Sequence, residues 1–274
     1  MLLVEADWLS SKYSGGDWKD SIIVVDGSWY LPNQKRDPLK EHMDCRIPKA
    51  RFFDIDSVCD PSSNLPHTIP DTNKFEKSMN KLGLKNTSHI VIYSKDGIGT
   101  SPRVWWLLKI FGHQKISILN GGFKAWKDIG GQSERGQYEN ITTNTYKANY
   151  NNNFFCNTEE VKSSMKKHNS QIVDARSRGR FKGIEPEPRK NLKGGHIPGS
   201  KNLPYQLFLN EKGFLLKADQ IKNVIAKADV DLNKSIISTC GSGVSACVLG
   251  LALELLGINN WKIYDGSWTE WGGR

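Results

Sequence analysis

Short runs of aliphatic residues alternate along the chain with segments of helical length. Residues 22–25, 89–93, 172–173 and 235–239 are such runs, rich in Ile and Val and bounded by polar or turn-forming residues. Apolar runs of this length are typical of buried strands, and strands that alternate with helices are typical of parallel sheets. The pattern predicts an α/β fold in which a parallel sheet is covered by helices on both faces.

The same pattern occurs twice. The strand predicted at 89–93 precedes an apolar helix that ends near Gly112, and the strand predicted at 235–239 precedes one that ends near Gly257. The two glycines lie 145 positions apart. Self-similarity at a fixed spacing indicates two copies of one structural unit in tandem.

An Asn- and Thr-rich stretch separates the two copies and is low in aliphatic residues. Such composition is typical of turns and connections. We therefore expect an N-terminal domain at 1–132, a linker at 133–157 and a C-terminal domain at 158–274. A chain of 274 residues is long enough for two domains of moderate core.

The composition, 38% hydrophobic and 24% charged, is that of a globular protein. The longest apolar runs, such as 104–108, are far shorter than the roughly 20 residues that cross a bilayer. We expect no membrane span. The N-terminus has neither the basic region nor the long apolar region of a secretory signal, so the expected location is the cytoplasm.

The formal net charge of +9 has three interpretations: a nucleic-acid partner, an anionic small substrate or a solvated basic surface. The basic residues are spread along the whole chain, and no motif of nucleic-acid recognition accompanies them. The second and third interpretations are favoured, and no nucleic-acid partner is expected.

The five cysteines are odd in number and scattered, and none belongs to a Cys-x-x-Cys pair. This spacing favours reduced thiols and excludes the common zinc-binding patterns, so no metal is expected. Four of them are interpreted as small buried hydrophobic residues, namely Cys45, Cys59, Cys156 and Cys247.

Cys240 stands in a different context. It begins a loop, 240–245, between a predicted strand and an apolar helix, where the ligand crevice of an open α/β sheet lies. Gly241 and Gly243 let the backbone curl so that successive N–H groups turn inward as a cradle for an anion. These amides and the following helix N-terminus would favour a thiolate, and equally a persulfide anion. Cys240 is therefore the candidate nucleophile.

The loop Cys-Gly-Ser-Gly-Val-Ser-Ala resembles that of the 3-mercaptopyruvate sulfurtransferases, two-domain members of the rhodanese family. In that family the usual loop has Thr where this chain has Ser245, which retains the hydroxyl. The resemblance covers nearly the whole chain and includes the segments 52–56, 65–67, 101–106, 195–200 and 264–271.

The resemblance implies tandem rhodanese-like domains and a sulfurtransferase that carries sulfur as a persulfide on Cys240. The implied donor is 3-mercaptopyruvate, which leaves as pyruvate, and the implied acceptor is a thiol such as thioredoxin, a small dithiol, or cyanide. No cofactor is implied. The N-terminal domain is expected to be catalytically inactive, since at the 145 spacing Lys95 falls opposite Cys240. The implied substrate-binding residues are Arg180, Arg189, Gly241, Gly243, Val244 and Ser245.

Arg180 and Arg189 suit a donor that carries a carboxylate, because a guanidinium matches carboxylate geometry in a bidentate pair. From the residues alone, solvated surface charge in a basic stretch remains the alternative. The resemblance also implies a relay from Asp60 and His67 to Ser242, in which His67 serves as base. The alternative for Asp60 and His67 is an ordinary loop between Pro and Ser residues.

Three other functions are alternatives for a chain with this cysteine loop. A cysteine phosphatase of related fold needs an Arg six positions after the cysteine, and Ala246 stands there. A thiosulfate sulfurtransferase typically carries basic side chains in the loop where this chain has Gly241 and Ser242. A non-enzymatic sulfur-relay or binding protein remains an alternative, although a pure scaffold would have no need of Cys240.

Overall fold

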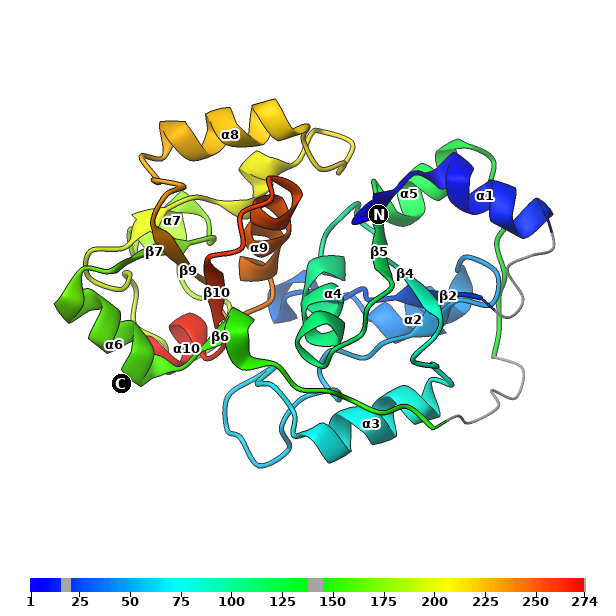
Figure 1. Cartoon of the computed structure of the whole chain (residues 1–274), viewed down its shortest axis with the longest axis horizontal. Helices are drawn as coiled ribbons and strands as arrows, with labels where there is room; N and C mark the ends of the chain where they lie inside the picture. Colours follow the sequence, from blue (N-terminus) through cyan, green and yellow to red (C-terminus); the bar gives the residue numbers. More distant parts are fainter. Residues whose placement is uncertain (16–20, 138–144, 274) are drawn as a thin grey trace. The chain divides into compact units, whose positions relative to one another are not determined.

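The computed structural model describes residues 1–15, 21–137 and 145–273. These residues form two compact units (Figure 1). The first unit comprises Met1–Asp60, Ile69–Asn151 and Glu211–Phe214, and the second comprises Pro61–Thr68, Asn152–Asn210 and Leu215–Arg274. Each unit therefore contains a short segment from the other half of the sequence.

The first unit is built on a sheet of five parallel strands in the order β1-β5-β4-β2-β3. The strands are β1 (Leu3–Val4), β2 (Ile22–Asp26), β3 (Arg51–Phe52), β4 (His89–Tyr93) and β5 (Ile116–Leu119). The α-helices are α1 (Ala6–Ser14), α2 (Pro38–Asp44), α3 (Thr72–Lys81), α4 (Ser101–Ile110) and α5 (Gly122–Asp128).

The second unit repeats this arrangement, with five parallel strands in the order β6-β10-β9-β7-β8. The strands are β6 (Phe155–Cys156), β7 (Ser170–Asp174), β8 (Lys201–Asn202), β9 (Ser235–Thr239) and β10 (Trp261–Tyr264). The α-helices are α6 (Thr158–Lys167), α7 (Arg178–Phe181), α8 (Ala218–Lys227), α9 (Ala246–Leu255) and α10 (Ser267–Trp271). The predicted tandem α/β repeat is confirmed.

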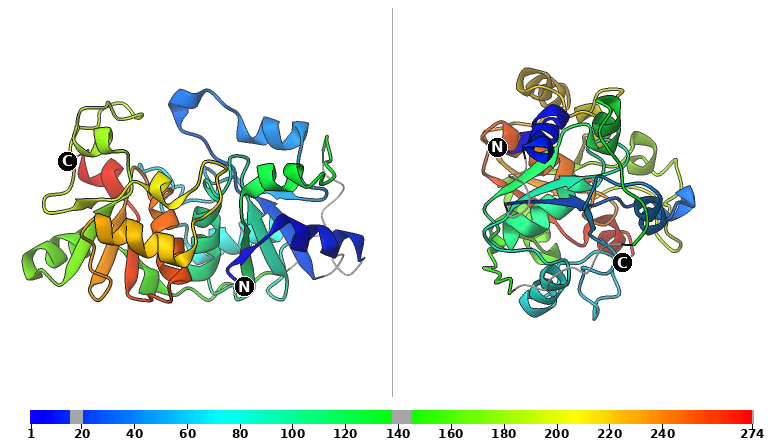
Figure 2. Two further views of the ribbon diagram at one scale, coloured as in Figure 1. Left: turned by 90° about the horizontal axis from the view of Figure 1, so that it is seen from above. Right: turned by 90° about the vertical axis from the view of Figure 1, so that its right-hand side faces the viewer.

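Burial explains why the apolar runs form strands and helices where they do. In β4 and β9 every residue after the first is buried, as expected for central strands of a covered sheet. The helices α4 and α9 follow these strands and are themselves almost wholly buried, packed against β4 and β5 or β9 and β10. Figures 1 and 2 show helices on both sides of the strands.

The register of the two sheets corrects the equivalence of Lys95 and Cys240. In the first unit Asp26 pairs with Tyr93, and in the second Asp174 pairs with Thr239, so the residues that follow these strands are Ser94 and Cys240. The loop before α4 is one residue longer than the loop before α9. The spacing is therefore 145 between α4 and α9 but 146 between β4 and β9.

A second contact confirms the corrected equivalence. The carbonyl oxygen of Ser94 accepts a hydrogen bond from the N–H of Phe123 at 2.9 Å, and that of Cys240 accepts one from the N–H of Trp268 at 3.0 Å. The Ser94 hydroxyl donates back into its own loop, to the carbonyl oxygens of Gly97 and Ile98. Ser94, and not Lys95, is the counterpart of Cys240.

The end of the segment expected as a linker packs on the first unit. The N–H groups of Asn149 and Asn151 donate to the carbonyl oxygens of Phe111 and Ile110, at 3.0 and 2.7 Å. Residues 138–144 of that segment lie outside the described residues. The domain boundaries drawn from composition stay a prediction.

Candidate active site

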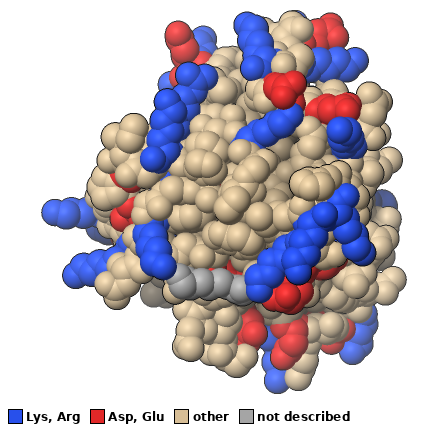
Figure 3. Space-filling model, turned by 90° about the vertical axis from the view of Figure 1, so that its left-hand side faces the viewer, with Lys and Arg blue, Asp and Glu red and all other residues tan. Residues whose placement is uncertain are grey.

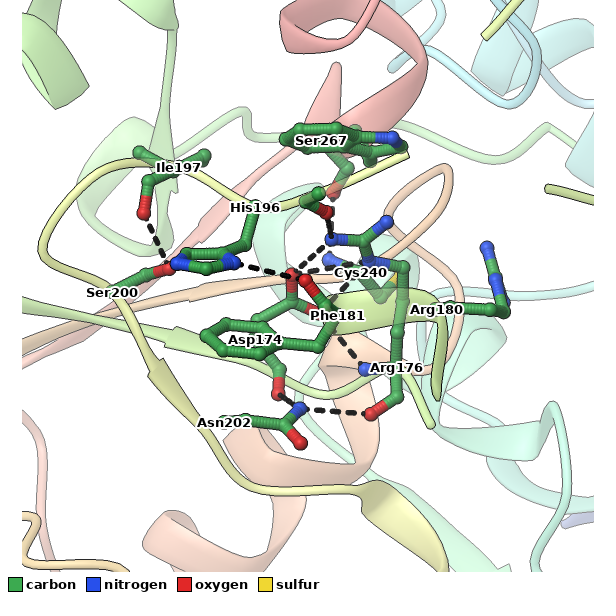
Figure 4. A network of polar contacts seen from close by, with 12 residues as sticks. Asp174, Arg176, Arg180, Phe181, His196, Ile197, Ser200, Asn202, Cys240 and Ser267 are labelled. Carbon is green, nitrogen blue, oxygen red and sulfur yellow. Dashed lines mark hydrogen bonds and ion pairs between the residues drawn. The ribbon is translucent and has the colours of Figure 1, made fainter. Parts of the chain in front are cut away.

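Cys240 directly follows β9 and is held by backbone hydrogen bonds to the start of α10. Its N–H donates to the hydroxyl oxygen of Ser267 at 3.1 Å, and its carbonyl accepts from Trp268 (Figure 4). The Cys240 side chain is 1% exposed. The cysteine therefore lies at the carboxyl end of a central strand, where an α/β sheet presents reactive groups.

The loop that follows is short, buried and curled. Gly243 has a φ of 75°, a conformation that glycine adopts without steric cost. The carbonyl of Gly241 accepts a hydrogen bond from Thr269 N–H at 2.8 Å, which ties the loop to α10. Ser242 and Val244 are buried, and Ser245 is half-buried. The loop after Cys240 is therefore held in one conformation by burial and by its hydrogen bond to α10.

Two arginine side chains approach this loop at Gly241. An added Cβ at Gly241 would lie 2.9 Å from Nη2 of Arg180 and 4.0 Å from Nη1 of Arg189. Arg180 comes from α7 and Arg189 from the loop after it. Both guanidinium groups therefore lie next to Gly241, the residue that follows Cys240. A side chain at position 241 would displace the Arg180 guanidinium from its present position.

Acidic residues hold this arginine cluster together. Glu187 accepts hydrogen bonds from Arg180 at 2.6 Å and from Arg176 at 2.7 Å. Arg176 also pairs with Asp174 at 2.7 Å, and its guanidinium lies 4.4 Å from the centre of the Trp268 ring. The sequence pattern singled out neither Arg176 nor Glu187. One feature of the sequence could have drawn attention to this cluster: both β2 and β7 end in an aspartate, Asp26 and Asp174.

A histidine stacks on the end of α7. His196 lies with its ring parallel to that of Phe181, at 3.9 Å between centres, and its Nδ1 lies 2.9 Å from the Phe181 carbonyl oxygen. Figure 4 shows this contact beside the Asp174–Arg176 pair. His196 therefore packs on the last residue of the short helix that carries Arg180.

His67 reaches the cysteine loop. Its Nδ1 lies 2.9 Å from the Ser242 hydroxyl oxygen, and its side chain is buried. The backbone of His67 is left-handed, with a φ of 63°. The segment Pro61–Thr68, although it comes from the N-terminal half, is part of the second unit. The contact gives Ser242 a partner that can accept or donate a proton.

Asp60 is the last residue of the opening segment of the first unit, and it is half-buried in a loop. Its part in a relay with His67 and Ser242 stays a prediction.

Two other cysteines of the second unit are also buried, Cys156 and Cys247. Cys156 lies in β6 and is fully buried, and this burial raises the pKa of its thiol far above the ordinary value. Such a thiol stays protonated and unreactive. Cys247 lies in α9 and donates to the carbonyl oxygen of Gly243 at 3.2 Å. Both positions agree with the structural role expected for them.

No group of three or more His, Cys, Asp or Glu side chains suited to a metal ion is found among the described residues. Nor is any helix of the described part of the chain long and apolar enough to cross a membrane. On the face shown in Figure 3, Lys and Arg side chains surround a broad area without charged side chains, and Asp and Glu lie among them. That face has no continuous basic patch.

A family model of the rhodanese-like domain matches the chain twice, over residues 6–129 and 157–274. A mouse protein named 3-mercaptopyruvate sulfurtransferase is 37% identical over 271 residues, which cover 98% of this chain and 91% of the mouse protein. A rat protein named thiosulfate sulfurtransferase is 37% identical over 274 residues, with the same two coverages.

Among solved structures, the crystal structure of SseA from Escherichia coli superimposes with a TM-score of 0.88 and 34% identity. The match covers 98% of this chain and 99% of SseA, which is described as a 3-mercaptopyruvate sulfotransferase of rhodanese fold.

Proposed function

The chain belongs to the family of rhodanese-like proteins, and from this premise we propose that it is a sulfurtransferase that moves sulfur from 3-mercaptopyruvate through a persulfide on Cys240. The observation that carries the proposal is the convergence of Arg180 and Arg189 on Gly241, beside the cysteine. A thiol nucleophile and two carboxylate-binding cations then meet at one loop, as a donor with a thiol and a carboxylate requires.

In the first half of the reaction the Cys240 thiolate attacks the sulfur of 3-mercaptopyruvate. A sulfur–sulfur bond forms, the carbon–sulfur bond breaks, and its electron pair leaves with the carbon fragment as the enolate of pyruvate. The enolate then takes up a proton and leaves as pyruvate. The electron pair that leaves with the carbon fragment balances the oxidation of the sulfur, so the step needs no external oxidant or reductant.

The residues around Cys240 divide the remaining work. Arg180 and Arg189 bind the donor's carboxylate and carbonyl oxygens and stabilise the charge of the enolate. Ser242 is placed to exchange a proton with the departing enolate, with His67 as its acid–base partner and Asp60 orienting His67. The backbone of Gly241, Gly243, Val244 and Ser245 forms the cradle of the persulfide.

In the second half a thiolate or cyanide attacks the outer sulfur of the persulfide and releases Cys240 as a thiolate. Thioredoxin, a small dithiol or cyanide would serve as acceptor, and the cytoplasm is the proposed location. The first unit contributes no nucleophile of its own, since the counterpart of Cys240 is Ser94, whose oxygen cannot carry transferable sulfur.

Thiosulfate is the alternative donor, because relatives named for either substrate are equally similar to this chain. Gly241 and Ser242 are uncharged, so the loop offers no cation of its own to a sulfonate group. A non-enzymatic sulfur-relay or binding protein would not need the two arginines at the cysteine loop. Both features favour 3-mercaptopyruvate as donor.

The donor is tested by comparing pyruvate release from 3-mercaptopyruvate with thiocyanate formation from thiosulfate and cyanide, at matched donor concentrations. We expect a higher kcat/KM with 3-mercaptopyruvate. A preference for thiosulfate would replace the donor and leave the sulfurtransferase reading in place, whereas no turnover with either would favour the non-enzymatic alternative.

The nucleophile is tested with Cys240→Ser. We expect this variant to lose sulfur transfer without unfolding, because the loop's size hardly changes. In the wild type, mass spectrometry after donor treatment should find one extra sulfur on the peptide that contains Cys240. Cys247→Ser is the control and should keep turnover. An adduct on Cys156 or Cys247 would disprove the assignment.

A further inference from the structure

Glu187 lies in a loop between α7 and β8, yet its carboxylate is 2% exposed. One carboxylate oxygen accepts from Nη1 of Arg176 at 2.7 Å, and the other accepts from Nη2 of Arg180 at 2.6 Å. The first oxygen also accepts from Nε of Arg180 at 3.3 Å. The carboxylate is thus clamped between two guanidinium groups.

One side of this clamp is anchored in the fold. The Arg176 side chain is fully buried, and it donates to both oxygens of Asp174 at the end of β7 and to the carbonyl of Gly195. Its guanidinium also lies over the Trp268 ring. Arg176 is therefore held by several partners, and it offers Glu187 a fixed ion-pair partner.

The other side is the arginine at the cysteine loop. Arg180 is carried by a helix of only four residues, and its side chain is 15% exposed. Among the described residues, both hydrogen bonds of its guanidinium go to Glu187. Without them, a long side chain with several rotatable bonds would be held only by packing.

We propose that Glu187 is a positioning residue, which holds the Arg180 guanidinium beside Gly241 before the donor arrives. In this position Nη2 of Arg180 lies 2.9 Å from the point that a Cβ added at Gly241 would occupy. The proposal rests on the proposed function for its substrate. An arginine that is ordered in the free enzyme loses less side-chain freedom when it binds a carboxylate. Glu187 acts through Arg180 and does not itself touch the donor.

Charge alone predicts the opposite effect. Asp174, Arg176, Glu187 and Arg180 alternate in sign, so the four charges cancel. Removing the negative charge of Glu187 would make the site more positive, and by electrostatics alone would strengthen the binding of an anionic donor. If Glu187 positions Arg180, its removal weakens donor binding instead. The direction of the change in KM therefore separates the two roles.

The position of Arg180 is tested without any turnover, by labelling with phenylglyoxal and following each arginine-containing peptide by mass spectrometry. In Glu187→Gln we expect Arg180 to react several-fold faster than in the wild type, with the exposed Arg178 unchanged as internal reference. Glu185→Gln is the matched control, because Glu185 lies in the same loop but accepts from Ser177 instead. An unchanged Arg180 rate would overturn the proposal.

Kinetics test the consequence for the donor. In Glu187→Gln we expect KM for 3-mercaptopyruvate to rise about 10-fold, from the rotamer freedom restored to one arginine. Discharge of a persulfide preloaded with inorganic polysulfide should keep its rate, because no donor carboxylate takes part. Glu187→Asp keeps the charge but is too short to reach both arginines, so its KM should rise as well. A lower KM in Glu187→Gln would overturn the proposal.

A double-mutant cycle closes the test. In the Arg180→Ala background, Glu187→Gln should cause no further loss of kcat/KM, because the residue through which it acts is gone. A second, additive loss would show that Glu187 acts elsewhere and would overturn the positioning role. If the wild type releases no pyruvate at all, the proposed function is wrong. The labelling rates of Arg180 still test whether Glu187 holds its guanidinium in place.

Discussion

At the scale of single residues, the site depends on side chains that are fixed before any substrate binds. His67 is the clearest case, because its backbone is left-handed and its ring is buried against the Ser242 hydroxyl. In the reaction proposed for this site His67 is the acid–base partner of Ser242, and a positioned acid–base group contributes about 10²–10⁴-fold to a rate.

We predict that His67→Asn lowers kcat for 3-mercaptopyruvate at least about 100-fold across pH of roughly 6 to 9. Asparagine tolerates the left-handed backbone, so the change removes the imidazole without straining the loop. His168→Asn is the matched control, since His168 has a φ of 52° and is exposed at the end of α6. Activity within about twofold of wild type in His67→Asn would rule out the relay.

The two arginines at Gly241 give a second prediction at this scale. A charge-assisted hydrogen bond contributes about 1.5–3 kcal/mol, so Arg180→Ala or Arg189→Ala should each lower kcat/KM for 3-mercaptopyruvate by roughly 10–150-fold. Steady-state pyruvate release measures this, with Arg178→Ala as the exposed neighbouring control. Unchanged kinetics in both variants would contradict the assignment of 3-mercaptopyruvate as donor.

At the scale of elements, the loop after the central strand decides what each unit can do. In the second unit the strand ends in a thiol and the short loop is tied to α10 by the Gly241 carbonyl. In the first unit the loop is one residue longer, and the hydroxyl of Ser94 closes it from within. The same strand and helix therefore carry a loop that begins with a cysteine in one copy, and a loop closed by the hydroxyl of its own serine in the other.

The connection after α4 supplies an element-scale prediction. His113 is buried, its Nε2 lies 2.9 Å from the Ser88 carbonyl oxygen, and its ring stacks on Tyr146. Burial lowers the pKa of His113 below its ordinary value of 6.5. The unfolded chain then binds more protons than the folded one between the two pKa values, so stability falls as pH drops below about 6.5.

We expect the melting temperature to decrease as the pH is lowered from about 7.5 to 5. Protonation of His113 accounts for a loss of unfolding free energy of at most about 1.4 kcal/mol per pH unit. His113→Gln should be less stable at neutral pH but should show a smaller decrease. Thermal unfolding at a series of pH values measures both. The same slope in His113→Gln and the wild type would exclude His113 as the source.

At the scale of the whole molecule, the chain exchanges short segments between its units. The segment Pro61–Thr68 brings His67 to Ser242, and Glu211–Phe214 joins the first unit, where Phe214 packs against Gly121. The second unit therefore cannot be reproduced from the C-terminal half of the sequence alone. The N-terminal half, for which we propose no sulfur carrier, supplies His67, which contacts Ser242 of the candidate site.

We predict that a fragment of residues 152–274 loses at least as much kcat as His67→Asn does in the full chain, because it lacks the partner of Ser242. The full-length Cys240→Ser variant gives the background rate, and circular dichroism checks that the fragment is folded. Mixing the fragment with residues 1–151 should restore part of the activity. A folded fragment with wild-type turnover would contradict a role for His67.

The sequence by itself determined the tandem α/β repeat, because the central strands of a covered sheet are buried on both faces, and β4 and β9 carry runs of aliphatic residues that recur in both halves. It also singled out the Cys240 loop, since two glycines between a strand and a helix permit a tight turn that other residues would strain. Both features follow from residues that are neighbours along the chain.

Only the tertiary structure decided which distant residues meet. The spacing of 145 gave Lys95 as the counterpart of Cys240, whereas the strand pairing gives Ser94, because a one-residue insertion in a loop leaves no mark on periodicity. Nothing in the local sequence singled out Arg176 or Glu187, and only their burial and ion pairs identify them as the residues connected to Arg180. A charge's role depends on its partners and its solvent exposure, and neither is written in its local sequence.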